Sequence, residues 1–364
     1  MAGVYISYPF CAQKCSYCNF ASGVLPAALE GEYIDALHRE IARQEWKWRP
    51  ETVYLGGGTP SRMEPSLLRG LLAEVPGAPW VEATIEAAPG SVTQDAAVAW
   101  REAGINRVSL GVQSFVTKEL AQTGRRHTAE VVEREIGTLR RAGMERINMD
   151  LIAGLPFQTR ESWIESLAWS ERLRPDHVSV YMLEVDEDSR LGIEIIKGGS
   201  RYGAAEAPSE GLVVELYELA VERLAGMGIR RYEISNFARP GFESRHNLKY
   251  WRLEPYVGFG ADAHSFDGRL RWQNAESPAE YVRRMREDGS ACMAETPADT
   301  TGERFFVGLR LRGGVSPTEE EWRRFGEPIR RFVDQGLMEI DGGTLRLSNR
   351  GVLLSNEVFE EFIV

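Results

Sequence analysis

Short apolar segments rich in valine, isoleucine and tyrosine alternate with longer amphipathic segments over the first half of the chain. The apolar segments are hydrophobic almost without interruption, which is typical of strands covered on both faces. They occupy residues 4–8, 52–55, 83–87, 107–112, 147–152 and 177–183. The segments between them have helical spacing and occupy residues 29–46, 66–74, 93–103, 128–142 and 160–172. Gly104 and Gly143 follow two of these segments, as expected of helix C-terminal caps.

This alternation predicts the architecture of the first half. Strands that alternate with helices form a parallel sheet with right-handed crossovers. Six such units predict an α/β fold, a partial (β/α)6 barrel of TIM-like type. Ligands of such folds gather at the carboxyl ends of the strands.

The pattern changes after about Ser189. Residues 198–207 predict a loop, 210–226 a helix, and 232–268 an irregular stretch dense in asparagine, glycine and aromatic residues. From Thr300 the pattern is helix, helix, hairpin, helix, with the hairpin turn at 341–343.

The change in pattern predicts three parts. They are a barrel over residues 1–205, an extension over 206–295, and an α+β domain that resembles a winged helix over 296–364.

Composition narrows the class of protein. The chain has 364 residues, of which 43% are hydrophobic and 27% charged, as in an ordinary globular protein. A net charge of −11 disfavours a nucleic-acid partner. There is no apolar run near the roughly 20 residues that cross a bilayer, and residues 1–5 lack the features of a signal peptide. We therefore expect a cytoplasmic protein without a transmembrane segment, and peripheral membrane contact stays open.

Three of the four cysteines, Cys11, Cys15 and Cys18, lie within eight residues. Three thiolates without a fourth leave a coordination position open on a metal or cluster. A structural zinc site is the alternative, but there is no second cysteine pair, and the nearest histidine, His38, falls on a predicted helix. The pattern favours an iron–sulfur cluster. We expect the distant Cys292 to be a buried, unligated thiol.

Further polar and glycine residues follow the other predicted strands. A glycine-rich run, 56–60, follows the second strand, Glu86 ends the third, Gln113 ends the fourth, and Asp150 lies in the fifth. Because these ends meet at one edge of a parallel barrel, we expect these residues to share a site.

The cysteine motif, followed one unit later by the glycine run, resembles the radical S-adenosylmethionine (SAM) superfamily. The resemblance implies a [4Fe-4S] cluster held by the three cysteines, with SAM on the fourth iron and reductive cleavage of its carbon–sulfur bond. Whether this chain cleaves SAM is left open, and no catalytic residue is assigned.

Within the superfamily the chain is similar to the coproporphyrinogen dehydrogenase-like branch, which implies a set of SAM contacts. Glu86 would bind the ammonium and Arg125 the carboxylate, although Arg125 also fits a solvated loop. Gln113 and Asp150 would bind the ribose hydroxyls, and Tyr17 would pack near the adenine. The implied set is Tyr5, Tyr17, Gly57, Gly58, Thr59, Glu86, Gln113, Arg125 and Asp150.

Two later runs, 232–241 and the HNxxYW run 246–251, resemble the heme-chaperone group of this branch. That resemblance implies a protein that binds heme and delivers it to heme-dependent, for example respiratory, proteins. It suggests His246 as a heme-iron ligand, with Tyr250 and Trp251 against the macrocycle. A histidine fixed by local hydrogen bonds is the alternative. A homodimer is a further family-level expectation.

The competing hypothesis is an oxygen-independent coproporphyrinogen III dehydrogenase that forms protoporphyrinogen IX. That enzyme has a further cysteine where this chain has Phe20, and a longer arm before the motif than the ten residues that precede Cys11. Both differences argue against the decarboxylase. The chain also departs from the branch at Ser7, Tyr8 and Ala88, which leaves details of SAM binding open.

Overall fold

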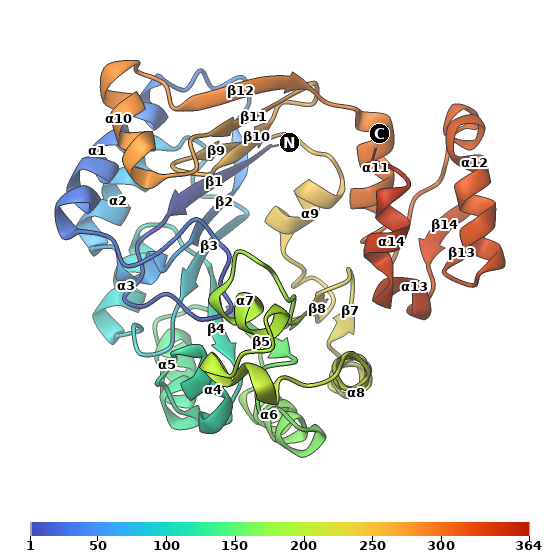
Figure 1. The fold of residues 1–364 in the computed structure, drawn as a ribbon. Coiled ribbons are helices and arrows are strands. Elements are labelled where there is room, and N and C mark those ends of the chain that lie inside the picture. The colour runs from blue at the N-terminus through green and yellow to red at the C-terminus, as the bar shows by residue number, and fades with distance from the viewer. Residues whose placement is uncertain (1, 364) are drawn as a thin grey trace.

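A single large sheet organises residues 2–363, the part of the chain that the computed structural model describes (Figure 1). Its order is β12-β11-β10-β9-β1-β2-β3-β4-β5-β6-β8-β7. The central six strands are parallel, which confirms the predicted α/β fold. They are β1 (Ala2–Tyr8), β2 (Pro50–Gly57), β3 (Glu82–Ala87), β4 (Arg107–Gln113), β5 (Arg146–Ala153) and β6 (His177–Met182).

Helices connect these strands, as the amphipathic segments predicted. They are α1 (Ala27–Arg43), η1 (Pro60–Arg62), α2 (Pro65–Glu74), α3 (Gln94–Glu102), α4 (Thr117–Thr123), α5 (Ala129–Arg141) and α6 (Arg160–Leu173). Thr93 and Thr159 cap α3 and α6 by accepting backbone N–H bonds. The seven-residue α4 was not predicted, because two turns are too short for a periodic signal.

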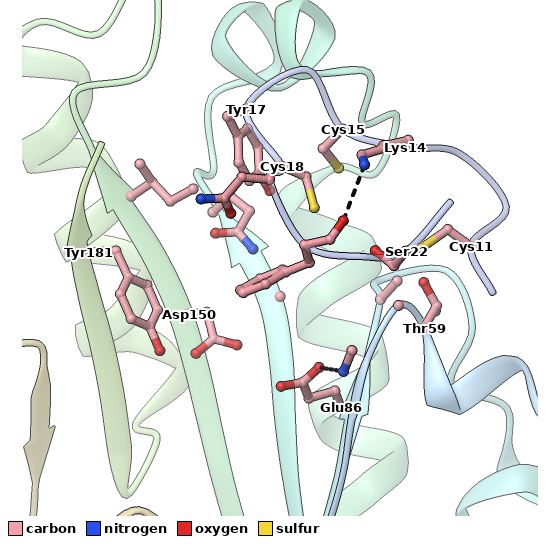
Figure 2. A pocket seen from close by; sticks show the side chains of 18 of the residues that line it. Cys11, Lys14, Cys15, Tyr17, Cys18, Ser22, Thr59, Glu86, Asp150 and Tyr181 are labelled. Atoms are coloured by element: carbon pink, nitrogen blue, oxygen red, sulfur yellow. Dashed lines mark hydrogen bonds between the residues drawn. The ribbon is translucent and has the colours of Figure 1, made fainter. Parts of the chain in front are cut away.

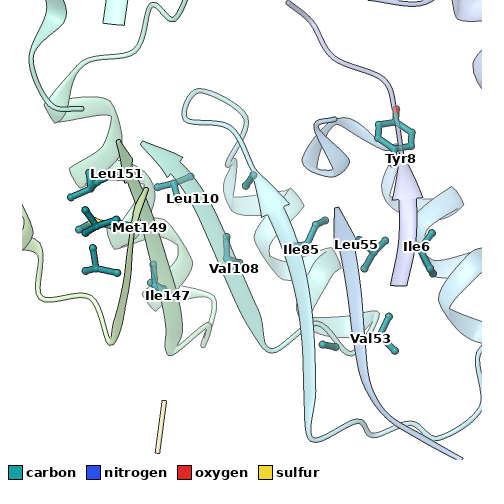
Figure 3. Close-up of a cluster of buried hydrophobic side chains, with 14 of the residues drawn as sticks. Ile6, Tyr8, Val53, Leu55, Ile85, Val108, Leu110, Ile147, Met149 and Leu151 are labelled. Atoms are coloured by element: carbon teal, nitrogen blue, oxygen red, sulfur yellow. The ribbon is translucent and has the colours of Figure 1, made fainter. Parts of the chain in front are cut away.

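The core lies between the central sheet and these helices. Figure 3 shows buried apolar side chains that β1 to β5 contribute. Ile6, Val53, Ile85, Val108 and Met149 are fully buried. Because the middle of each strand is buried in this core, a ligand site can form at the carboxyl ends of the strands.

The sheet continues beyond both ends of the parallel section. β9 runs parallel to β1, and β8 runs antiparallel to β6. The added elements are α7 (Arg190–Ile196), η2 (Arg201–Glu206), α8 (Glu210–Gly226), β7 (Arg230–Arg231), β8 (Asn236–Ala238), α9 (Arg245–Trp251), β9 (Tyr256–Phe259), β10 (His264–Phe266), β11 (Leu270–Asn274), α10 (Pro278–Glu287) and β12 (Cys292–Pro297). The prediction of an irregular stretch over 232–268 was therefore wrong, since it holds three strands and a helix too short to show a period.

A smaller C-terminal domain follows the sheet and packs against α9 through α11 (Figure 1). It consists of α11 (Thr300–Gly308), α12 (Glu319–Asp334), β13 (Met338–Asp341), β14 (Thr344–Leu347), α13 (Asn349–Leu353) and α14 (Ser355–Glu360). Phe305, Phe325 and Phe362 form its centre, with ring centroids 5.0 to 5.2 Å apart. The predicted hairpin is present as β13 and β14. Within residues 2–363 there is no helix with the length and hydrophobicity needed to span a membrane.

One carboxylate ties α1 to the extension. Glu40 accepts hydrogen bonds from the Gly260 backbone N–H at 2.8 Å, the Asn274 amide at 2.6 Å and the Tyr281 hydroxyl at 2.7 Å. Desolvation outweighs these bonds and raises the pKa of Glu40 to about 7.

We expect Glu40 to make the protein less stable as the pH rises from about 4.5 to about 7. The folded state binds more protons than the unfolded chain in this window, so the free energy of unfolding falls as pH increases. Urea unfolding at pH 5 and pH 7.5 should show a loss for the wild type on the order of 2 kcal/mol larger than for Glu40→Gln. Parallel pH profiles for the two proteins would contradict this role.

Candidate cofactor site

The three clustered cysteines lie on the loop between β1 and α1, which we call the cysteine loop (residues 9–23). Backbone hydrogen bonds close it, from Cys11 N–H to the Gly23 carbonyl at 2.8 Å and from Gly23 N–H to the Pro9 carbonyl at 2.9 Å. Two more bonds fasten the loop and the end of β1 to the turn after β2, from Gly58 N–H to the Tyr8 carbonyl at 2.8 Å and from Thr59 N–H to the Phe10 carbonyl at 3.0 Å. Backbone hydrogen bonds thus hold the cysteine loop in place.

A cavity of about 390 Å³ opens beside this loop at the carboxyl ends of the strands. All three cysteines line it (Figure 2). Of the nine predicted SAM contacts, eight also line it: Tyr17, Gly57, Gly58, Thr59, Glu86, Gln113, Arg125 and Asp150. Tyr5 is the exception, because it lies outside the lining and stacks on Tyr54 at 6.2 Å between ring centroids. The fold therefore brings together residues that are up to 139 positions apart, from Cys11 to Asp150.

The cysteine sulfurs do not converge on a single point. In residues 2–363 no three histidine, cysteine or acidic side chains are grouped closely enough to hold one metal ion. A cluster does not need such convergence, because each thiolate binds a different iron. The donor set of three thiols at the mouth of a cavity fits a cluster with one open iron.

Two carboxylates enter the cavity from β3 and β5 (Figure 2). Glu86 accepts hydrogen bonds from the Tyr54 hydroxyl at 2.8 Å and the Gly57 N–H at 3.2 Å. Asp150 accepts from Ser109 at 3.1 Å and from the Asn148 amide at 2.7 Å. Desolvation raises the pKa of both carboxyl groups, that of Glu86 to about 7. A cationic ligand would restore the charged form of Glu86.

Three buried polar atoms on the cavity wall have no hydrogen-bond partner: the Tyr17 hydroxyl, the Gln113 Oε1 and the Arg125 Nε. An unpaired buried polar atom costs about 1–3 kcal/mol. Gln113 also has a φ of 67°, a backbone conformation that side-chain-bearing residues rarely adopt. Orphaned donors and acceptors together with backbone strain fit a wall shaped for a polar ligand.

Sequence reasoning missed two residues that complete this wall. Tyr54 and Ser109 line the cavity and hold Glu86 and Asp150 by hydrogen bonds. The sequence could have indicated both residues, because Tyr54 lies in the strand that ends at Gly57 and Ser109 lies in the strand that ends at Gln113, and both strand ends carried predicted site residues.

The rim of the cavity is partly apolar. Phe20 lines it and is 66% exposed, while its carbonyl accepts a hydrogen bond from Lys14 at 3.1 Å. Tyr181 is exposed on the opposite strand, β6. Apolar surface at the mouth of a polar cavity suits a larger ligand or partner.

The HNxxYW run lies elsewhere, on α9, which packs against β1 and β2. His246 is 1% exposed, and its ring bonds to the Thr52 hydroxyl at 2.9 Å and to the Tyr250 hydroxyl at 2.7 Å. Burial, with the charges of Lys249 and Arg107, lowers the pKa of His246 to about 3. Both ring nitrogens are therefore already in use.

This placement corrects the expectation that His246 stands ready to bind heme iron. Glu82 fixes the start of α9 by accepting hydrogen bonds from the Ser244 hydroxyl at 3.2 Å and the His246 N–H at 2.9 Å. Tyr250 packs edge-on to Tyr256, and Trp251 lies under the Arg310 guanidinium at 4.4 Å. As folded, the run is internal structure, which matches the alternative of a histidine fixed by local hydrogen bonds.

Cys292 also differs from its prediction. It begins β12, is half-buried rather than buried, and does not line the cavity. It has no place among the candidate ligands.

Comparison with known proteins follows the same division as the fold. The model of the radical SAM superfamily matches residues 5–170, and that of the HemN C-terminal domain matches residues 296–354. The chain belongs to the radical SAM superfamily, and membership implies a [4Fe-4S] cluster and SAM.

Curated relatives define the family more narrowly. The chain is 33% identical to the heme chaperone HemW of Bacillus subtilis, over 100% of this chain and 99% of that protein. It is 32% identical to HemW of Lactococcus lactis, over 99% and 97%. Within the superfamily, it belongs to the HemW family.

A solved structure shares the whole fold. Coproporphyrinogen III oxidase (HemN) of Escherichia coli superposes with a TM-score of 0.85 at 24% identity, covering 99% of this chain and 89% of that one. At this identity the likeness shows the fold and says nothing of the reaction.

The close approach of the glycine turn to the cysteine loop is open to a direct test. A Cβ on Gly58 would lie 2.8 Å from the Pro9 carbonyl carbon and 2.9 Å from the Phe10 carbonyl oxygen, whereas one on Gly23 would meet nothing within 4 Å. We expect Gly58→Ala to lower the free energy of unfolding by roughly 1–3 kcal/mol and to reduce iron uptake on anaerobic reconstitution. Gly23→Ala, the matched control on the same loop, should change neither property. Equal effects of the two substitutions would contradict the inference that the close approach at Gly58 holds the cysteine loop in place.

Proposed function

We propose that this chain carries heme and delivers it to heme-dependent proteins, respiratory enzymes among them, with a cluster and SAM bound in the cavity. The observation that carries the proposal is similarity over the whole chain to proteins named heme chaperone. The cavity beside the cysteine loop supports the cofactor part independently of those names.

The residues of the cavity suggest how it holds the cofactors. Cys11, Cys15 and Cys18 would supply the three thiolates of the cluster. A bound and reduced cluster supplies an electron for cleavage of the SAM carbon–sulfur bond. Glu86 would bind the SAM ammonium, and Arg125 would bind the carboxylate through the Nε that has no partner in this structure.

The remaining wall residues would orient the nucleoside half of SAM. Asp150 and Gln113 suit the ribose hydroxyls, and Tyr17 suits the adenine. Gly57, Gly58 and Thr59 would let the backbone approach the ligand. Tyr5 would not contact SAM directly, but would support the cavity wall by stacking on Tyr54.

Finer expectations remain proposals. They are the division into parts at 1–205, 206–295 and 296–364, a cytoplasmic location, a homodimer, and peripheral contact with a membrane that holds heme-receiving proteins.

A heme titration tests the proposal. We expect the anaerobically reconstituted protein to bind heme stoichiometrically, with a saturable change in the Soret band, and to form no protoporphyrinogen IX from coproporphyrinogen III with SAM and dithionite. Absence of saturable binding would sink the carrier function, and protoporphyrinogen formation would favour the dehydrogenase.

His246→Ala separates the two roles of the HNxxYW run. Because the ring is buried and doubly hydrogen-bonded, we expect this variant to keep the Soret position and lose about 2–4 kcal/mol of stability. Thr52→Val, the matched control, removes one of the same hydrogen bonds and should be milder, at about 1–3 kcal/mol. If His246→Ala abolished the Soret change while Thr52→Val did not, the result would show that His246 binds the heme iron directly.

Glu86→Gln tests the SAM assignment. The amide keeps the shape but loses the negative charge, and a hydrogen bond to a charged group contributes about 1.5–3 kcal/mol. We therefore expect SAM affinity, measured by equilibrium dialysis on the reconstituted protein, to fall at least about tenfold. Glu40→Gln is a control, since it changes another desolvated carboxylate, one that does not line the cavity. Wild-type affinity in Glu86→Gln would remove Glu86 from the site.

A further inference from the structure

A second cleft, of about 290 Å³, lies where the end of the large sheet meets the C-terminal domain. Its walls come from β7, from the segment after α11, and from β14 with the start of α13. We call it the arginine cleft, because Arg231, Arg310, Arg312 and Arg346 line it. It shares no lining residue with the cavity beside the cysteine loop.

The charge of the arginine cleft is not balanced by the residues around it. Among its lining residues Glu339 is the sole carboxylate, at 3.5 Å from Arg346. Arg346 also pairs with Asp341 at 2.8 Å, and Arg310 lies 3.5 Å from Glu233. Two of the four guanidinium groups thus have carboxylate partners.

The other two arginines have none. Within residues 2–363, neither Arg231 nor Arg312 has a carboxylate oxygen within 4 Å. Arg231 donates to neutral groups, the Tyr217 hydroxyl at 3.4 Å and the Asn349 side-chain oxygen at 3.3 Å. In a chain of net charge −11, two unpaired guanidinium groups in one cleft form a local positive site that the overall charge does not explain.

The cleft is also held rigid. The Arg310 guanidinium stacks on Trp251 at 4.4 Å, and its Nε is buried without a partner. The Arg312 backbone N–H donates to the Tyr232 carbonyl at 3.0 Å, which fixes this segment against the sheet. The Arg310 side chain, already positioned, would lose less entropy when it binds an anion.

We propose that the arginine cleft binds an oxyanion group, phosphate or carboxylate, and that the bound group bridges the sheet and the C-terminal domain. Guanidinium groups bind both oxyanions in bidentate fashion, so two sources share this chemistry. One is a free phosphorylated metabolite. The other is the pair of carboxylates that heme carries, and this second source alone rests on the proposed heme function.

Calorimetric titration of the full-length, reconstituted protein with inorganic pyrophosphate, and separately with citrate, tests the site. At constant ionic strength we expect saturable binding of at least one probe at one site per chain. The double variant Arg231→Gln/Arg312→Gln should weaken it at least tenfold. Arg323→Gln is the matched control, because Arg323 is exposed on α12 of the same domain and lies outside the cleft.

Each outcome decides the proposal. No saturable binding of either probe, unchanged affinity in the double variant, or an equal loss in Arg323→Gln would overturn it. Urea unfolding of the double variant checks that it folds. Should the double variant be unstable, Arg312→Gln alone serves, since its exposed side chain makes no hydrogen bond in the described residues.

Competition identifies the source. If heme displaces the bound probe and heme dimethyl ester does not, the carboxylates of heme are the ligand. If neither displaces it, the cleft serves a free anion. Because the Soret titration measures heme uptake independently, failure of the carrier function and failure of the arginine cleft give different results.

Discussion

Backbone hydrogen bonds between the cysteine loop and the turn after β2 are the constraint on which the candidate site depends. They join the carboxyl ends of two neighbouring parallel strands, so the cysteines and the glycine turn cannot move apart without breaking both strand ends. The absence of a side chain at Gly58 is what allows the approach, since any Cβ there would meet the Pro9 carbonyl. The cavity wall then follows from the register of the sheet, which places Glu86 and Asp150 at the same edge.

Below that edge the barrel is filled by polar side chains that satisfy one another. Asp150 accepts from Asn148, Asn148 bonds to His177 at 2.6 Å, and His177 bonds to the Tyr232 hydroxyl at 2.9 Å. Tyr232 in turn accepts from the Ser244 N–H at the start of α9. A continuous hydrogen-bonded chain thus links the cavity to the helix that carries the HNxxYW run. A buried polar network of this kind fixes one arrangement, because each unsatisfied member would be costly.

The parallel strands, most of the helices and the convergence of Glu86, Gln113 and Asp150 could be predicted from the sequence for a physical reason, whereas the full set of nine residues, eight of which line the cavity, came from the family resemblance. Buried parallel strands are apolar runs, and their ends must meet at one edge, so motif order along the chain fixes which residues converge. The short elements β8, α9 and β10 were not predicted, because each spans too few residues to show a period. The environment of His246 could not be predicted, because it is set by Thr52 and Glu82, which are 194 and 164 residues away in sequence. Tyr5, which was named from the family resemblance, lies outside the cavity lining and stacks on Tyr54.

The two runs that mark the heme-chaperone resemblance meet in space at one side chain. Arg310 lies between Glu233, from the run 232–241, and Trp251, from the HNxxYW run. Glu233 is fully buried, and desolvation raises the pKa of its carboxyl group, although Arg310 and the hydrogen bond from the Ser235 N–H oppose that rise. Both runs therefore contact the place where the sheet meets the C-terminal domain, at Arg310, which we call the joint. That joint forms one wall of the arginine cleft, and a ligand there would reach α9 through Arg310 and Trp251. From α9 the hydrogen-bonded interior continues to Asp150, which makes the joint and the cavity two ends of one connected structure.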